Sequence, residues 1–195
     1  MNKTTKTYQA IKPLTEVILT GKMLCIDPST GSQSSMPGYA WYEKGVLIES
    51  GIIEVDYRLN KSLRLYEIAR TIREEFPVPD ILVVEYIPPV SYRGGMNNVA
   101  IMALQKSIGA IVGAHPFKNL LEIPASAWKA YKTEDYVKSD QDDAVMLGRC
   151  AIMASLEIRA EDDIVIKKVN KRKKKTPKKK VKTRCQKKKG RRIIS

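Results

Sequence analysis

Short runs of apolar residues alternate along the chain with segments in which apolar residues recur at helical spacing. Two runs, at 23–26 and 81–84, are apolar throughout, and each ends in an acid, Asp27 and Glu85. Such runs are typical of central strands that are covered on both faces, so we expect these two strands to be neighbours. Further strands are expected at 39–42, 45–48, 51–55 and 120–123.

Helical spacing first appears between residues 62 and 76, where Ser62 can cap the helix and Pro77 can end it. Two further helices are expected at 99–113 and 140–158, with a short one from Ser126. Small residues line one face of the 140–158 helix and suit close packing. The alternation of strands and helices predicts an α/β fold, a mixed sheet flanked by helices.

The charge is distributed unevenly over the 195 residues, which suffice for one domain. The net charge is +14, yet residues 1–165 hold 18 basic and 21 acidic residues. Residues 166–195 hold 17 basic residues and no acid. We expect an N-terminal extension at 1–21, a globular domain at 22–165 and a polybasic tail at 166–195 that is disordered when free. Such a tail indicates a polyanionic partner. The near-neutral charge of residues 1–165 excludes a uniformly basic protein of the histone type.

The remaining composition excludes several classes of protein. No apolar run approaches the length of a membrane span, and the first residues lack the apolar core of a signal peptide, so we expect a soluble protein with no membrane partner. The three cysteines form no CxxC pair and His115 is the only histidine, which argues against zinc and for reduced, intracellular thiols. We expect a cytoplasmic or nucleoid-associated protein, or a nuclear one in a eukaryote.

Acidic residues stand at the ends of the elements expected to form the core. Asp27 and Glu85 close the two central strands, and Asp140, Asp142 and Asp143 open the last helix. Converging carboxylates repel one another unless protons or a cation compensate, and oxygen donors favour Mg²⁺ or Mn²⁺. Two such ions would suit phosphodiester hydrolysis. Asp140 and Asp143 share one helix face, so we favour this pair over Asp142.

Each acid also has an ordinary structural explanation. The Asp27-Pro28 pair can start a turn, Glu85 can be a surface strand end, and acids at 140–143 are favoured at a helix N-terminus. The joint occurrence of these acids at the edges of apolar elements favours a site over three coincidences.

Three segments resemble the RuvC family of Holliday junction resolvases, in order and over residues 23 to 158. They read IDPSTGSQSSMPGYAWYEKG, PDILVVEYIPP and SDQDDAVMLGRCAI. In that family a strand ends in Asp-Pro, a second apolar strand ends in Glu, and the last helix carries Asp-x-x-Asp-Ala. Residues 98–105 with Gly109 are similar to the family's central helix, and Ile123-Pro124 with Trp128-Lys129 is similar to its strand-then-lysine segment.

The resemblance implies a ribonuclease-H-like fold and a homodimer that makes paired nicks in four-way DNA junctions. It implies that Asp27, Glu85, Asp140 and Asp143 bind the metal ions, with no small-molecule cofactor, and that Lys129 is an active-site cation. The chain departs from the pattern at Ser29, where the family usually has Gly, and in a longer loop before Gly38. The tail and the N-terminal extension are also additional, which is compatible with a phage or viral member.

Other residues are candidates for binding nucleic acid. Near Glu85, aromatic and arginine side chains could contact the bases of an opened junction, although packing explains them equally well. The cations of the tail bind phosphates by counterion release, the alternative being a solvated segment without a specific role. These candidates are Tyr86, Tyr92, Arg93, Lys129, Lys173, Lys174, Lys175, Lys178, Lys179 and Lys180.

The leading hypothesis from the sequence is a metal-dependent, structure-selective DNA endonuclease that resolves branched DNA. One alternative is a noncatalytic nucleic-acid-binding protein with a nuclease-like fold, whose acids serve only as caps and turns. Another keeps the enzyme but changes the substrate to RNA, RNA:DNA hybrids or flaps, because one fold hosts many activities.

Overall fold

The computed structural model describes residues 6–87, 98–134 and 136–174, and of 165–174 only the backbone. The chain divides into two units, residues 1–161 and 162–195, and the sheet lies in the first. Five strands form this sheet in the order β3-β2-β1-β4-β5. They are β1 (Lys22–Asp27), β2 (Gly38–Glu43), β3 (Val46–Ile52), β4 (Ile81–Tyr86) and β5 (Asn119–Pro124).

The sheet is mixed, as the sequence predicts. β1 pairs with β2 and β2 with β3 in antiparallel fashion, whereas β1, β4 and β5 run parallel. The two fully apolar strands are neighbours, and their register ends with Ile26 opposite Val84. Asp27 and Glu85 therefore follow side by side at the carboxyl edge of the parallel strands.

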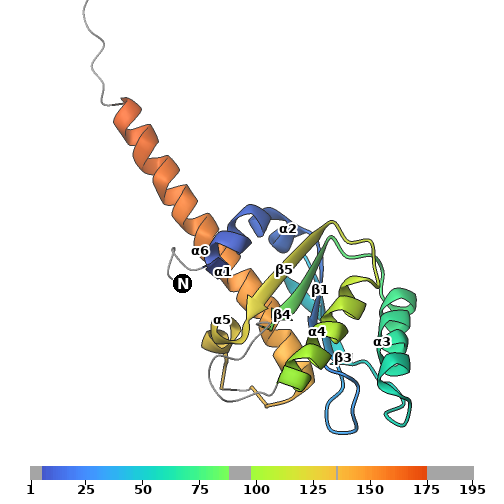
Figure 1. Cartoon of the computed structure of the whole chain (residues 1–195). Coiled ribbons are helices and arrows are strands. Elements are labelled where there is room, and N and C mark those ends of the chain that lie inside the picture. The colour runs from blue at the N-terminus through green and yellow to red at the C-terminus, as the bar shows by residue number, and fades with distance from the viewer. Residues whose placement is uncertain (1–5, 88–97, 135, 175–195) are drawn as a thin grey trace, which may run out of the picture. The chain divides into compact units, whose positions relative to one another are not determined.

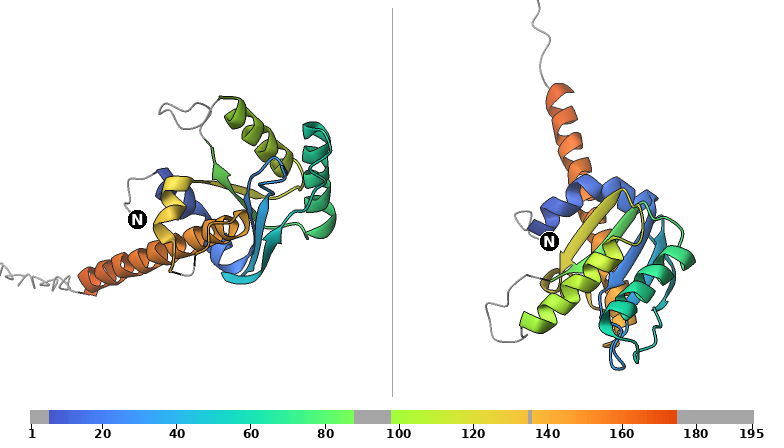
Figure 2. Two further views of the ribbon diagram at one scale, coloured as in Figure 1. Left: turned by 90° about the horizontal axis from the view of Figure 1, so that it is seen from below. Right: turned by 45° about the vertical axis from the view of Figure 1, so that its right-hand side comes forward.

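Helices cover both faces of the sheet. They are α1 (Lys6–Ile11), η1 (Lys12–Leu14), α2 (Thr15–Thr20), α3 (Lys61–Glu75), α4 (Asn98–Val112), α5 (Ala125–Trp128), η2 (Lys129–Tyr131) and α6 (Asp140–Lys174). Figures 1 and 2 show α3 and α4 on one face and the beginning of α6 on the other. No helix in the described ranges is both long and apolar enough to cross a membrane.

Alternation along the central strands produces two hydrophobic layers. Met23 and Cys25 of β1 point into the layer under α6, whereas Leu24 and Ile26 point into the layer under α3 and α4. The small face of α6 allows close approach, and Ala144 and Ala151 are fully buried against the sheet. This confirms the packing face predicted for the last helix.

The edge of the sheet differs from the prediction of two strands at 45–48 and 51–55. One strand, β3, joins the two segments, with Glu49 and Ser50 paired to β2, and it ends at Ile52 rather than at residue 55. β3 is an edge strand, where polar side chains can face solvent, so the apolar pattern breaks without ending the ladder. Lys44 and Gly45 both have positive φ and form the tight hairpin turn before β3.

Both ends of the chain contain more helix than the sequence pattern indicates. Residues 6–20 are largely helical, and Ile11 and Ile18 from this segment are fully buried in the layer under α6. The last helix continues to Lys174 rather than ending near 158. Lys, Arg and Glu are good helix formers, so the helix can extend without apolar packing. Residues 175–195 lie outside the described residues.

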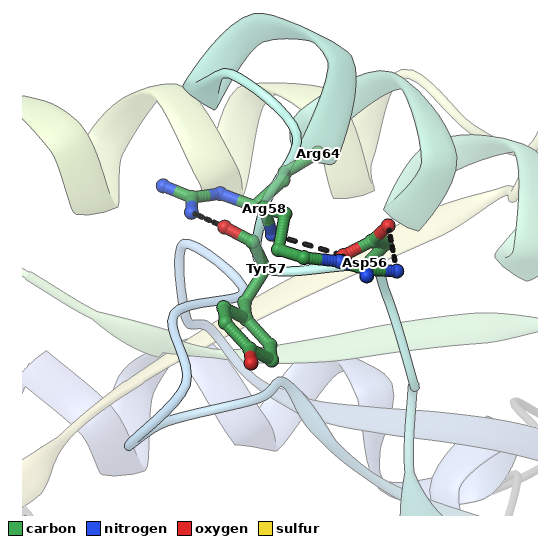
Figure 3. A network of polar contacts seen from close by, with 4 residues as sticks. All are labelled: Asp56, Tyr57, Arg58 and Arg64. Carbon is green, nitrogen blue, oxygen red and sulfur yellow. Dashed lines mark hydrogen bonds and ion pairs between the residues drawn. The ribbon is translucent and has the colours of Figure 1, made fainter.

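A polar network orders the connection between β3 and α3 (Figure 3). Arg58 forms two side-chain hydrogen bonds with Asp56, at 2.8 and 2.9 Å, and Arg64 donates to the Tyr57 carbonyl at 2.6 Å. Asn60 then caps α3 by accepting from the Leu63 amide at 3.0 Å. Asn60, rather than the predicted Ser62, is therefore the N-cap, and α3 begins at Lys61.

Candidate active site

The candidate site lies at the carboxyl edge of β1 and β4, where α6 begins. Asp27 is 8 % exposed and Glu85 is half-buried. Asp27 and Glu85 share a side-chain hydrogen bond, and the charges of Asp140 and Asp143 both act on Asp27. The structure thus brings together the four acids that the sequence singles out from three separate segments.

Burial raises the pKa of Asp27 to about 9, with further contributions from the hydrogen bond to Glu85 and the neighbouring carboxylates. Burial also raises the pKa of Glu85, whereas the hydrogen bond from Asp27 and the positive charge of Lys129 oppose this shift. At neutral pH the carboxyl of Asp27 therefore stays protonated, and its O–H donates the hydrogen bond to Glu85. The two carboxyl groups behave as one site, in which a single proton relieves the repulsion between the carboxylates as a bound cation would.

Two hydroxyl groups hold the acids of α6. Ser35, in the loop after β1, donates to Asp140 Oδ2 at 3.1 Å, and Tyr136 donates to Asp143 Oδ1 at 2.5 Å. The Ser35 hydroxyl also lies 3.1 Å from the buried Ser29 Oγ. Ser29 is therefore part of the network that fixes this loop beside α6.

Asp142 has a different role from its neighbours, as the helical spacing predicts. The Ser139 hydroxyl accepts from the Asp142 amide at 3.1 Å and lies 3.0 Å from the Asp142 carboxylate. This is the capping interaction of a helix N-terminus. Asp142 is thereby engaged in starting α6, whereas Asp140 and Asp143 act on Asp27.

Lys129 lies at the start of η2, next to the site. Its charge lowers the pKa of Glu85, and its Nζ lies 5.1 Å from the centroid of the buried Trp128 ring. Lys132 approaches the same ring at 5.4 Å and the Tyr136 ring at 3.6 Å. The aromatic residues thus hold two cations, of which Lys129 acts on Glu85.

A groove of about 470 Å³ opens beside Asp140 and Asp143. Its other walls include Ser34 and Ser35 of the loop after β1, together with Lys138. The loop after β1 therefore forms one side of the groove. Hydroxyl and ammonium groups in this arrangement suit a phosphate backbone.

The donor set has the chemistry of a site for a hard divalent cation, because all four members are carboxylates. Over the described ranges, however, no three His, Cys, Asp or Glu side chains are arranged around one point that could hold a metal ion. Instead Asp27 forms a hydrogen bond with Glu85. Asp140 accepts a hydrogen bond from Ser35, and Asp143 accepts one from Tyr136. A cation here would have to replace the proton of the Asp27 pair.

The remaining sequence candidates are only partly described. Tyr86 follows Glu85 and is 40 % exposed. Lys173 and Lys174 end α6, and nothing is described of their side chains. The candidates outside the described residues are Tyr92, Arg93, Lys175, Lys178, Lys179 and Lys180.

Sequence reasoning missed Ser35 and Tyr136. Both lie in polar loops, where neither hydrophobic periodicity nor a motif marks them. An aromatic residue four positions before Asp140, in an otherwise polar stretch, is the one local signal for Tyr136. Ser35 has no such signal among the serines of its loop.

No protein-family model matches the sequence, and no curated protein sequence matches it significantly. Solved structures do share its fold. RuvC of T. thermophilus, in complex with a Holliday junction substrate, matches with a TM-score of 0.50 at 15 % identity, over 71 % of this chain and 97 % of that chain. The yeast mitochondrial Holliday junction resolvase Ydc2 matches with a TM-score of 0.50 at 10 % identity, over 78 % and 90 %. The chain therefore has the ribonuclease-H-like fold of RuvC-type resolvases, which confirms the predicted fold.

Proposed function

We propose that this chain, which has the fold of RuvC-type resolvases, is a metal-dependent, structure-selective DNA endonuclease that resolves four-way junctions and other branched DNA by paired nicks. The observation that carries the proposal is the convergence of Asp27, Glu85, Asp140 and Asp143 at the carboxyl edge of the central strands. The similar RuvC structure holds a Holliday junction substrate, which supports the class of substrate. A homodimer would present two such sites to two strands.

Asp27, Glu85, Asp140 and Asp143 would hold Mg²⁺ or Mn²⁺. Such ions, when bound, supply an activated water and neutralise the charge that develops on the phosphate. The chain's own contribution begins with the Asp27 pair, which must release its shared proton to accept a cation. Lys129, beside Glu85, then offers a fixed positive charge to the phosphate or the leaving oxygen.

The DNA would contact the protein on several surfaces. The groove beside Asp140 presents the Ser34 hydroxyl and the Lys138 ammonium to the backbone of the scissile strand. Tyr86, and Tyr92 with Arg93 in the segment that follows, would contact opened bases. The lysines and arginines of the polybasic tail would raise the rate of encounter and the strength of binding.

The test is cleavage of a synthetic four-way junction with Mg²⁺ or Mn²⁺, beside linear duplex, flap, RNA and RNA:DNA hybrid controls. Wild type is compared with Asp27→Asn and with Glu16→Gln, which alters an exposed carboxylate on α2. We expect symmetric paired nicks from wild type and Glu16→Gln, and none from Asp27→Asn. Asp27→Asn should still bind the junction, because the amide is as neutral as the protonated carboxyl and the surfaces proposed to contact DNA are unchanged.

A second candidate is a noncatalytic protein that binds nucleic acid. It is favoured by one observation, that no three side chains of the described part form a ready metal site. Junction binding without cleavage under every metal would support this candidate against the endonuclease. Cleavage of a flap, hybrid or RNA in preference to the junction would retain the enzyme and change its substrate.

A further inference from the structure

Tyr136 connects the loop before α6 to the carboxylate cluster. Its hydroxyl donates to Asp143 Oδ1 at 2.5 Å. Its amide donates to the Thr133 carbonyl at 3.1 Å, closing a turn in the loop. Its ring is partly buried against the hydrophobic layer under α6. The hydroxyl is therefore presented to Asp143 from a ring that cannot swing freely.

Lys132 holds the same ring from another side. Its Nζ lies 3.6 Å from the centroid of Tyr136 and 5.4 Å from that of Trp128. Trp128 is almost fully buried, so it is a rigid base for this contact. A cation over an aromatic face is attracted by the ring's quadrupole, and Lys132 thereby bridges a fixed ring and the ring that orients Asp143.

The consequence concerns the freedom of the Asp143 carboxylate. Asp143 acts electrostatically on both Asp27 and Glu85, so its orientation affects the whole cluster. The hydrogen bond from Tyr136 occupies Oδ1 and limits rotation of the carboxylate. Within the described residues, Tyr136 is the one side chain that donates a hydrogen bond to this carboxylate, so Oδ2 is left for another ligand.

We propose that Tyr136 is a positioning residue of the candidate active site, which holds Asp143 with one carboxylate oxygen available to a divalent cation, and that Lys132 fixes the Tyr136 ring in this role. This inference rests on the proposed function, because it assigns Tyr136 to the metal-binding state of the same site. A purely structural role, in which the bond only anchors the loop, would change stability without changing the affinity for the cation.

The experiment measures Mn²⁺ binding by isothermal titration calorimetry on the full-length protein without DNA. Tyr136→Phe removes only the hydroxyl, and Tyr66→Phe removes an exposed hydroxyl on α3 as the matched control. We expect Tyr136→Phe to weaken Mn²⁺ binding by about 10-fold or more, and Tyr66→Phe to leave it unchanged. Junction affinity without metal should be the same in all three proteins.

A second pair of variants ties the effect to the named contacts. Lys132→Gln keeps the hydroxyl but loosens the ring, and should weaken Mn²⁺ binding about twofold to threefold. It also provides the test if Tyr136→Phe fails to fold, as judged by circular dichroism. In an Asp143→Ala background, which removes the acceptor, adding Tyr136→Phe should produce no further loss, because the two changes break one interaction.

The outcomes separate this inference from the proposed function. If wild type binds Mn²⁺ and Tyr136→Phe binds it equally well, the positioning role is wrong and the endonuclease proposal stands. If Tyr136→Phe changes only the melting temperature, the bond is a structural anchor and the inference is likewise overturned. If wild type binds no divalent cation, the metal-dependent function fails and this inference fails with it.

Discussion

Asp27 donates a hydrogen bond to Glu85 across two adjacent parallel strands, at the edge where both strands end. Each side chain follows an apolar run that is buried on both faces. Two carboxylates so placed cannot both be ionised at low cost, so one proton stays between them. Because the two carboxyl groups are so close, either a shared proton or a divalent cation can relieve the repulsion between them.

The first prediction concerns pH and the stability of the metal-free protein. Since the pKa of Asp27 is raised from 3.8 to about 9, the folded state holds a proton that the unfolded state has released over this range. The contribution of the protonated Asp27 to the free energy of unfolding is thus fully present below pH 3.8, and it is lost as pH rises through about 9. We expect unfolding free energy, measured by urea denaturation with chelator, to fall with pH by up to about 1.4 kcal/mol per unit.

Asp27→Asn should flatten this pH dependence, because the amide cannot release a proton. Glu16→Gln, at an exposed carboxylate, serves as the control and should keep the wild-type slope. A wild-type slope that survives in Asp27→Asn would show that another group holds the proton. Added Mn²⁺ should stabilise wild type increasingly as pH rises, because the cation and the proton compete for the same carboxylates.

The second prediction concerns the approach of α6 to the sheet. A Cβ at Gly38 would lie 1.8 Å from the carbonyl oxygen of Asp140, so any side chain there must displace the start of α6. Gly38→Ala should therefore abolish cleavage, and it should destabilise the protein by about 1–3 kcal/mol. Thermal melting and the junction assay measure the two effects.

Gly109→Ala provides the matched control for that substitution. Nothing lies within 4 Å of a Cβ at Gly109, which is inside α4. Replacing a helical glycine by alanine usually stabilises by about 0.5–1 kcal/mol. Cleavage by Gly109→Ala should match wild type. Equal activity of Gly38→Ala and Gly109→Ala would contradict the dependence of the site on this close contact.

The third prediction concerns Lys129. If its charge supports the phosphate, Lys129→Gln should lower kcat by about 100-fold while changing junction affinity little. Lys118→Gln alters an exposed lysine before β5, at the other end of that strand, and should leave kcat unchanged. Single-turnover cleavage at saturating protein measures the effect. A loss confined to affinity would assign Lys129 to binding alone.

The fourth prediction concerns the tail. Residues 175–195 hold 11 basic residues and no acid, and each phosphate they neutralise adds about 0.9 to the salt slope of binding. Deleting them should weaken junction binding and reduce the slope of log Kd against log salt by several units. Replacing Lys178, Lys179 and Lys180 by Gln should have a smaller effect of the same sign. An unchanged slope would remove the tail from the DNA interface.

The loop between β1 and β2, which contains Ser35, illustrates why part of the site could not be predicted from the sequence. The four acids can be recognised in the sequence because each ends or begins an element that hydrophobic periodicity marks. Ser35 and Tyr136 contact those acids from loops, and their partners lie on α6. Such contacts depend on how the chain turns between elements, which no periodic pattern records.

By itself the sequence determined the identity of the central strands, the acids at their ends, the helix that opens with Asp140, and the separation of a near-neutral body from a basic tail. These features follow from local hydrophobic spacing and charge, which act over a few neighbouring residues. Only the tertiary structure decided that β3 is one strand, that Ile11 and Ile18 join the core, and that Asp27 shares a proton with Glu85. These outcomes depend on packing and desolvation between distant segments, which arise only when the sheet and its helices assemble.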